Sequence, residues 1–175
     1  MSQSITAPRA LLVTHDQMQR AFEVSATKVA DAQWAREQLL AAGAVEAFSP
    51  PAIGEYWPGQ GGIYDGQVRE ADGTIYHQIH ADVKPPKRLN HGDATKWAGS
   101  LSIDGHSDFV LPTRRGAALL YANLADRFEK GWHWTSETYA GNASYAWSCH
   151  FYGGDQLTNR KGYEGLAVAV RRFVL

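Results

Sequence analysis

The middle of the chain alternates apolar and polar residues in the manner of a β-hairpin. Strand-like runs at 63–69 and 74–83 lie on either side of Asp72-Gly73, and Asp-Gly between two such runs is typical of a tight hairpin turn. After Gly131 the sequence is again rich in aromatic residues, which favours β-structure. The strands predicted there are Trp132–Glu137, Tyr145–Tyr152 and Ala167–Val174. We expect these late strands to pair with one another in one antiparallel sheet.

Helical patterns lie before and between these strands. Residues 16–42 are rich in alanine, glutamine, glutamate and arginine and carry an interrupted apolar stripe, which predicts one bent helix or two. A short helix is predicted from Asp93, its N-cap, to about Leu101, and another helix follows Thr113, which is also a good N-cap. The buried face of this last helix is predicted to consist of Ala117, Leu120, Tyr121 and Leu124.

The order of these elements predicts the fold class. Strands followed by short helices and then by further strands are typical of an α+β fold with an antiparallel sheet. Residues 50–62 are rich in proline and glycine, so we interpret them as a junction. The sequence therefore predicts an N-terminal arm and helical segment at 1–50 and a domain at 51–175.

Charge and composition restrict the classes of partner. The formal net charge is -1, so no positive field would attract the chain to a phosphate backbone, and nucleic acid is not an expected partner. The start of the chain has no signal-peptide pattern and no later stretch is apolar enough to span a bilayer, so no membrane partner is expected. The predicted location is the cytoplasm, or a virion if a phage encodes the protein.

Candidate metal ligands have weak spacing. His77 and His80 lie three positions apart in a predicted strand, so their side chains should point to opposite faces and not bind one ion. Asp104 and Asp108 are compatible with a calcium site, but an Asx-type turn explains them as well and is the preferred interpretation. Cys149 is the single cysteine, and we expect it to be a small core residue. The sequence predicts no metal and no cofactor.

The second half of the chain carries an ordered set of short motifs. They are Asp93–Ala98 (DATKWA), Asp104–Thr113 (DGHSDFVLPT), Trp132–Glu137 (WHWTSE) and Ala169–Arg172 (AVRR). In this order the motifs resemble the C-terminal domain family of the Legionella collagen-like adhesin, over about residues 53–175. The resemblance implies a C-type-lectin-like fold that is common in bacteria and phages and distantly related to formylglycine-generating enzymes.

Departures from related lectins and enzymes limit what this resemblance implies. The chain has no Glu-Pro-Asn, Gln-Pro-Asp or Trp-Asn-Asp triplet, so calcium-dependent sugar binding is not expected. One cysteine cannot supply the cysteine pair of the formylglycine-generating enzymes. The family motif describes how a fold is held together, so it transfers architecture more readily than function.

Loops between the late strands are the predicted ligand-binding surface. The segments 139–144 and 153–165 combine tyrosine with glycine, asparagine and basic residues, a composition suited to recognition. The candidate ligand-binding residues are Tyr139, Asn142, Tyr152, Asp155, Asn159, Arg160, Lys161 and Tyr163. A separate basic set could form an anion-binding patch if the fold gathers it: Arg114, Arg115, Arg127, Lys130, Arg160, Lys161, Arg171 and Arg172.

Three classes of function follow from these patterns. The first is a recognition module that binds a glycan or protein ligand without catalysis and that a phage or prophage encodes. The second is a structural or assembly protein of a phage particle, in which residues 16–42 mount the domain on a homo-oligomer or on virion proteins. The third is an enzyme of unknown class on a scaffold like that of the formylglycine-generating enzymes. No catalytic residue is predicted.

Overall fold

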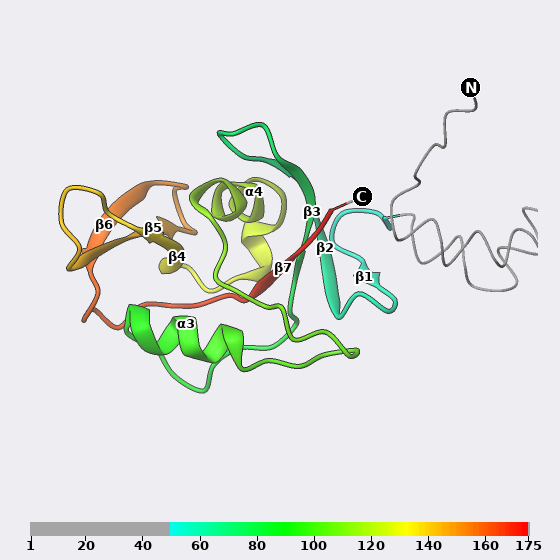
Figure 1. Cartoon of the computed structure of the whole chain (residues 1–175), viewed down its shortest axis with the longest axis horizontal. Coiled ribbons are helices and arrows are strands. Elements are labelled where there is room, and N and C mark those ends of the chain that lie inside the picture. The colour runs from blue at the N-terminus through cyan, green and yellow to red at the C-terminus, as the bar shows by residue number, and fades with distance from the viewer. Residues whose placement is uncertain (1–49, 175) are drawn as a thin grey trace, which may run out of the picture. The chain divides into compact units, whose positions relative to one another are not determined.

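The computed structural model describes residues 50–174, and the chain from Pro51 onward forms one compact unit (Figure 1). Its architecture is α+β, with helices α3 and α4 and two antiparallel sheets. The predicted helical segment at 16–42, with its suggested role in assembly, lies outside the described residues.

A four-stranded sheet contains the predicted hairpin. Its strand order is β1 (Tyr56–Trp57), β2 (Gly62–Arg69), β3 (Ile75–His80) and β7 (Val170–Phe173), and all neighbours are antiparallel. Gly73 has a φ of 91°, a left-handed conformation that glycine adopts at little cost, so the predicted Asp-Gly turn is confirmed. Strand β3 ends at His80, earlier than predicted.

The second sheet is a three-stranded meander. Its order is β4 (Trp132–Thr138), β5 (Tyr145–His150) and β6 (Gln156–Arg160). Strand β6 lies inside the segment 153–165 that the sequence predicted to be a loop. The loop prediction failed there because Gln, Thr and Asn have little apolar character, and the edge strand is held by its backbone pairing with β5.

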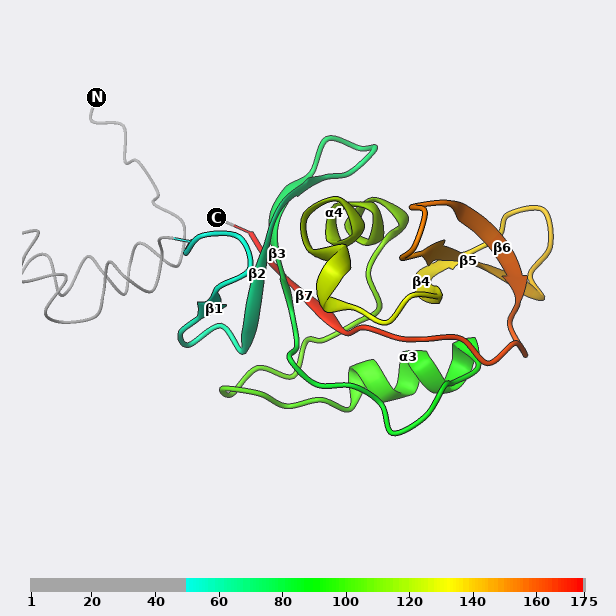
Figure 2. The same cartoon turned by 180° about the vertical axis from the view of Figure 1, so that it is seen from behind.

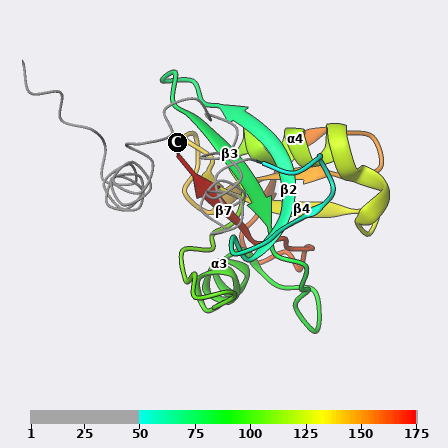
Figure 3. The same cartoon turned by 90° about the vertical axis from the view of Figure 1, so that its right-hand side faces the viewer.

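The expected single sheet of late strands is wrong. Strand β7 pairs with β3 in the first sheet, and only Leu166, upstream of it, contacts β4 through one parallel bridge. The C-terminal segment then passes between the two helices (Figures 1 and 3). Val170 packs on the α4 side with Ala117 and Leu120, and Ala169 packs in the cluster that contains α3. Burial on both sides fixes the path of this apolar segment.

Helix α3 spans His91–Gly99, and its N-cap is Asn90, not the predicted Asp93. Asn90 Oδ1 accepts a hydrogen bond of 3.0 Å from the backbone N–H of Asp93. The helix thus starts earlier than predicted, because asparagine satisfies the same free N–H groups that aspartate would.

Helix α4 spans Arg114–Leu124 and lies between the two sheets, as Figure 2 also shows. Its N-cap is Thr113, as predicted. The predicted face is buried at Ala117, Leu120 and Leu124, and Tyr121 is half-buried. A short 3₁₀ turn, η1 (Ala125–Arg127), continues the helix and leads toward β4.

Loss of the Thr113 cap should destabilise the fold measurably. Thr113 Oγ1 accepts a 3.0 Å hydrogen bond from Gly116 N–H and donates one of 2.7 Å to Glu70. We expect Thr113→Ala to lower the free energy of unfolding by about 1–2 kcal/mol, measured by urea denaturation. Thr113→Ser keeps the hydroxyl and should retain most of the stability. Equal losses in both variants would show that the methyl group, not the cap, matters.

Candidate functional site

A hollow of about 790 Å³ opens at one end of the three-stranded sheet. The turn between β4 and β5, the end of β6 and the segment after it supply its walls. The lining residues are Asn142, Ser144, Tyr145, Asn159, Arg160, Gly162 and Tyr163. A volume of this size falls within the ~300–1,000 Å³ range of small-ligand sites.

Strand register explains why these residues meet. Tyr145 opens β5 and lies opposite Arg160, the last residue of β6. Arg160 Nε donates a 3.0 Å hydrogen bond to the Tyr145 hydroxyl, which holds the guanidinium across the end of the sheet. In the turn, Asn142 Oδ1 accepts a 2.9 Å hydrogen bond from Ser144 N–H. The turn and the strand end therefore form one surface.

Four predicted ligand-binding residues line this hollow, and they are Asn142, Asn159, Arg160 and Tyr163. Two more lie close to it. Lys161 Nζ donates a 2.8 Å hydrogen bond to Thr138 Oγ1 at the end of β4. The ring of Tyr139 lies edge-on to Trp147 at 5.9 Å and is 39% exposed.

The other two predicted residues, Tyr152 and Asp155, are not part of this surface. They lie in the turn between β5 and β6, where Cys149 faces Gln156 at the end of the sheet opposite the Tyr145 pair. Successive turns of an antiparallel meander fall at opposite ends, so the two predicted loops cannot form one surface across their whole lengths. Ser144, which the prediction omitted, lines the hollow instead.

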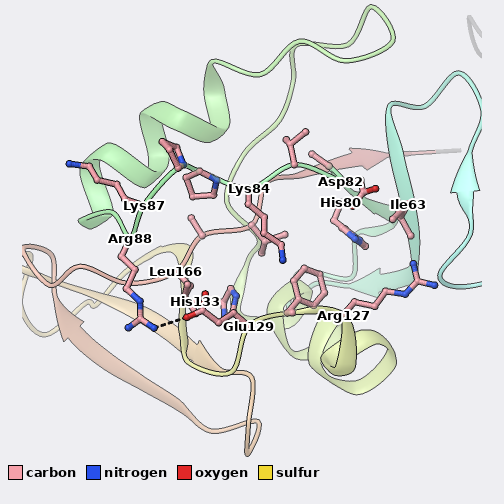
Figure 4. A pocket seen from close by; sticks show the side chains of 17 residues that line it. Ile63, His80, Asp82, Lys84, Lys87, Arg88, Arg127, Glu129, His133 and Leu166 are labelled. Atoms are coloured by element: carbon pink, nitrogen blue, oxygen red, sulfur yellow. Dashed lines mark hydrogen bonds and ion pairs between the residues drawn. The ribbon is translucent and has the colours of Figure 1, made fainter.

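A second cavity, a cleft of about 780 Å³, lies between the two sheets beside α4 (Figure 4). Its walls come from the end of β3 and the loop after it, from the η1–β4 connection and from the C-terminal segment. Apolar lining residues include Ile63, Val83, Pro85, Phe128 and Leu166. Charged lining residues are Asp82, Lys84, Lys87, Arg88, Arg127 and Glu129. Sequence reasoning missed this cleft because its walls are far apart along the chain.

A buried carboxylate–imidazole pair lies at this cleft. His80 lines the cleft and is 4% exposed, and its Nδ1 contacts the carboxylate of Asp65, which is fully buried. Gln78 Nε2 donates a 3.1 Å hydrogen bond to the same carboxylate. Burial raises the pKa of Asp65, and the hydrogen bonds from His80 and Gln78 act in the opposite direction. The ring of Phe128 lies 5.1 Å from the His80 ring.

A second histidine at the cleft has a different environment. The ring of His133 stacks on Phe151 at 4.0 Å and is 3% exposed. Burial lowers the pKa of His133 to about 4, so the ring is neutral near pH 7. Cys149 is fully buried, as expected, and burial raises the pKa of its thiol to about 11. Near neutral pH both side chains are therefore uncharged and pack in the core.

The candidate metal ligands named from the sequence make side-chain contacts within the fold. His77 contacts the Tyr64 hydroxyl and Trp57, on the sheet face opposite to His80, as predicted. Asp104 has a left-handed φ of 51° next to Gly105, and its carboxylate accepts a 2.6 Å hydrogen bond from Tyr56. Within residues 50–174, no three His, Cys, Asp or Glu side chains are grouped to hold a metal ion.

The basic residues suggested as one anion patch make contacts in different parts of the fold. Arg114 stacks over Trp147 at 3.6 Å, and Arg172 lies over Tyr76 at 5.1 Å. Arg171 is 6% exposed and donates a 2.9 Å hydrogen bond to Asp108. These three guanidinium groups contact different elements of the fold, so they do not form the single anion patch that the sequence left open.

No helix in the part of the chain that the structure describes is long and apolar enough to cross a membrane. No protein-family model matches the sequence, and a search of curated proteins found no match.

Proposed function

We propose that the domain is a recognition module with a C-type-lectin-like fold that binds a glycan without altering it. The observation that carries the proposal is the hollow at the end of the three-stranded sheet. It joins aromatic rings, amide groups and a guanidinium, contributed by Tyr145 and Tyr163, by Asn142 and Asn159 and by Arg160.

These groups match what a sugar offers. Tyrosine rings supply flat apolar surface for the C–H face of a sugar, and Tyr163 is 40% exposed. Asparagine and arginine side chains supply hydrogen bonds in fixed directions to hydroxyl groups. Tyr145 and Arg160 lie opposite each other on paired strands and are joined by a side-chain hydrogen bond, so these two side chains lose less conformational entropy on binding. The α+β arrangement and the ordered motifs of the second half support the proposed fold.

Truncation of the hollow should weaken binding and leave the fold intact. We expect the variant Tyr139→Ala/Arg160→Ala/Tyr163→Ala to lose about 1–3 kcal/mol of binding free energy, the scale of hot-spot residues. The full chain, fluorescently labelled, would be applied to an immobilised glycan panel, and the glycan that binds would be titrated in solution by calorimetry. Recovery of that glycan unchanged after incubation would exclude turnover.

Tyr152→Ala is the matched control, because Tyr152 is a 68% exposed tyrosine at the opposite end of the same sheet. It should bind like the unmodified chain. Tyr163 lies edge-on to the core residue Trp134 at 6.1 Å, so its truncation in the triple variant could disturb folding. The single variant Arg160→Ala is therefore measured as well, because Arg160 is exposed and its truncation should leave the fold intact. Equal losses in the triple variant and in Tyr152→Ala, or no loss in either, would place the ligand elsewhere and overturn the proposal.

A further inference from the structure

The cleft between the sheets carries an excess of positive charge. Its lining contains Lys84, Lys87, Arg88 and Arg127 against Asp82 and Glu129. Arg88 donates a 2.7 Å hydrogen bond to Glu129, so that pair is neutral overall. The other three cations form no ion pair with carboxylates of residues 50–174. An excess of positive charge in a cleft raises the local concentration of anions.

Figure 4 shows how these groups are arranged. The Lys84 side chain extends into the space between the walls, and Arg127 and Arg88 lie toward opposite ends of it. The ring of Phe128, which belongs to the wall, lies 5.1 Å from the His80 ring and 6.0 Å from the His133 ring. Cations from two separated parts of the chain, the loop after β3 and η1, thus lie around an apolar surface.

His80 gives this cleft a fixed polar group. Its Nδ1 is held by the buried carboxylate of Asp65, so the opposite ring edge, with Nε2, is oriented by the fold. Nε2 forms no hydrogen bond with any atom of the described residues, although the His80 side chain is only 5% exposed. Nε2 is therefore free to form a hydrogen bond with a ligand group in the cleft.

We propose that this cleft binds a small organic anion that carries a phosphate group on an apolar body. Lys84 and Arg127 would pair with the phosphate oxygens, and His80 Nε2 would share a proton with one of them. Phe128, Val83 and Pro85 would cover the apolar body. This site is separate from the hollow of the proposed function, because the two cavities share no lining residue.

Phenyl phosphate is a direct probe of this proposal. We expect saturable binding to the full chain in calorimetry at low salt. Inorganic phosphate, which lacks the apolar body, should bind at least about tenfold more weakly, and phenol, which lacks the charge, should not bind. Binding should weaken as salt is added, because screening acts on charge pairs at an open cleft. Absence of saturable phenyl phosphate binding, or equal binding of the three probes, would overturn the proposal.

Charge removal within the cleft supplies the second test. Lys84→Met/Arg127→Met removes both charges, keeps an unbranched apolar stem at each position and should weaken phenyl phosphate binding at least about tenfold. Lys96→Met/Lys130→Met is the matched control, because it removes the same charge from two exposed residues that do not line the cleft. Both double variants should melt within a few degrees of the unmodified chain. Equal binding by the two variants would show that the cleft cations do not form the site.

Discussion

Trp134→Ala should be among the most destabilising single substitutions in the described domain, lowering the free energy of unfolding by about 3–5 kcal/mol. The indole is fully buried. Its ring lies edge-on to His91 of α3 at 5.3 Å, and its N–H donates a 2.9 Å hydrogen bond to the Leu89 carbonyl. Alanine would leave a cavity between α3 and β4 and would remove one of the two hydrogen bonds to the Leu89 carbonyl, which also accepts one from Gly165 N–H. Urea denaturation followed by far-UV circular dichroism measures the loss.

Trp132→Ala is the matched control on the same strand. Trp132 is half-buried, and its ring lies 4.7 Å from that of His150 near the surface. Truncation should therefore cost clearly less than at Trp134, because water can occupy part of the vacated space. A similar loss at both positions would mean that the core around α3 does not depend on the Trp134 ring.

His80→Phe should cost about 3–5 kcal/mol near neutral pH, because it leaves Asp65 as a buried carboxylate with Gln78 as its remaining side-chain partner. The loss should depend on pH. Burial already raises the Asp65 pKa above its ordinary 3.8, and removing the histidine, which lowers that pKa, raises it further. The folded variant then holds a proton that the unfolded chain releases above about pH 4, so its stability falls as pH rises through the raised pKa.

Denaturation at pH 5 and pH 8 would test this expectation. The variant should be closer in stability to the unmodified chain at pH 5 than at pH 8. The double variant Asp65→Asn/His80→Phe removes the buried charge and should recover part of the loss at pH 8. A loss that is the same at both pH values and is not recovered by Asp65→Asn would show that shape, not charge, is what His80 contributes.

Local signals determined much of the secondary structure. The Asp72-Gly73 turn and the Thr113 cap were predicted correctly because each depends on residues close in sequence, a left-handed glycine in one case and a side chain bonded to the N–H three positions on in the other. The α+β class also followed from the order of patterns along the chain. Strand β6 escaped prediction because its partner β5, not its own composition, makes it a strand.

Only the tertiary structure decided which distant segments meet. The sequence determined that Val170 lies in an apolar strand but not that β3 is the partner of this strand. All strands pair through the same backbone N–H and C=O groups, so the sequence of one strand does not select its neighbour. It likewise supplied four of the hollow's residues while placing Tyr152 beside them, since the antiparallel course of the meander, not composition, separates the two turns. The cleft at His80 exists only after packing, because its cations and its apolar walls come from segments near residues 63, 80–88, 127–133 and 166–168, which are far apart in the sequence.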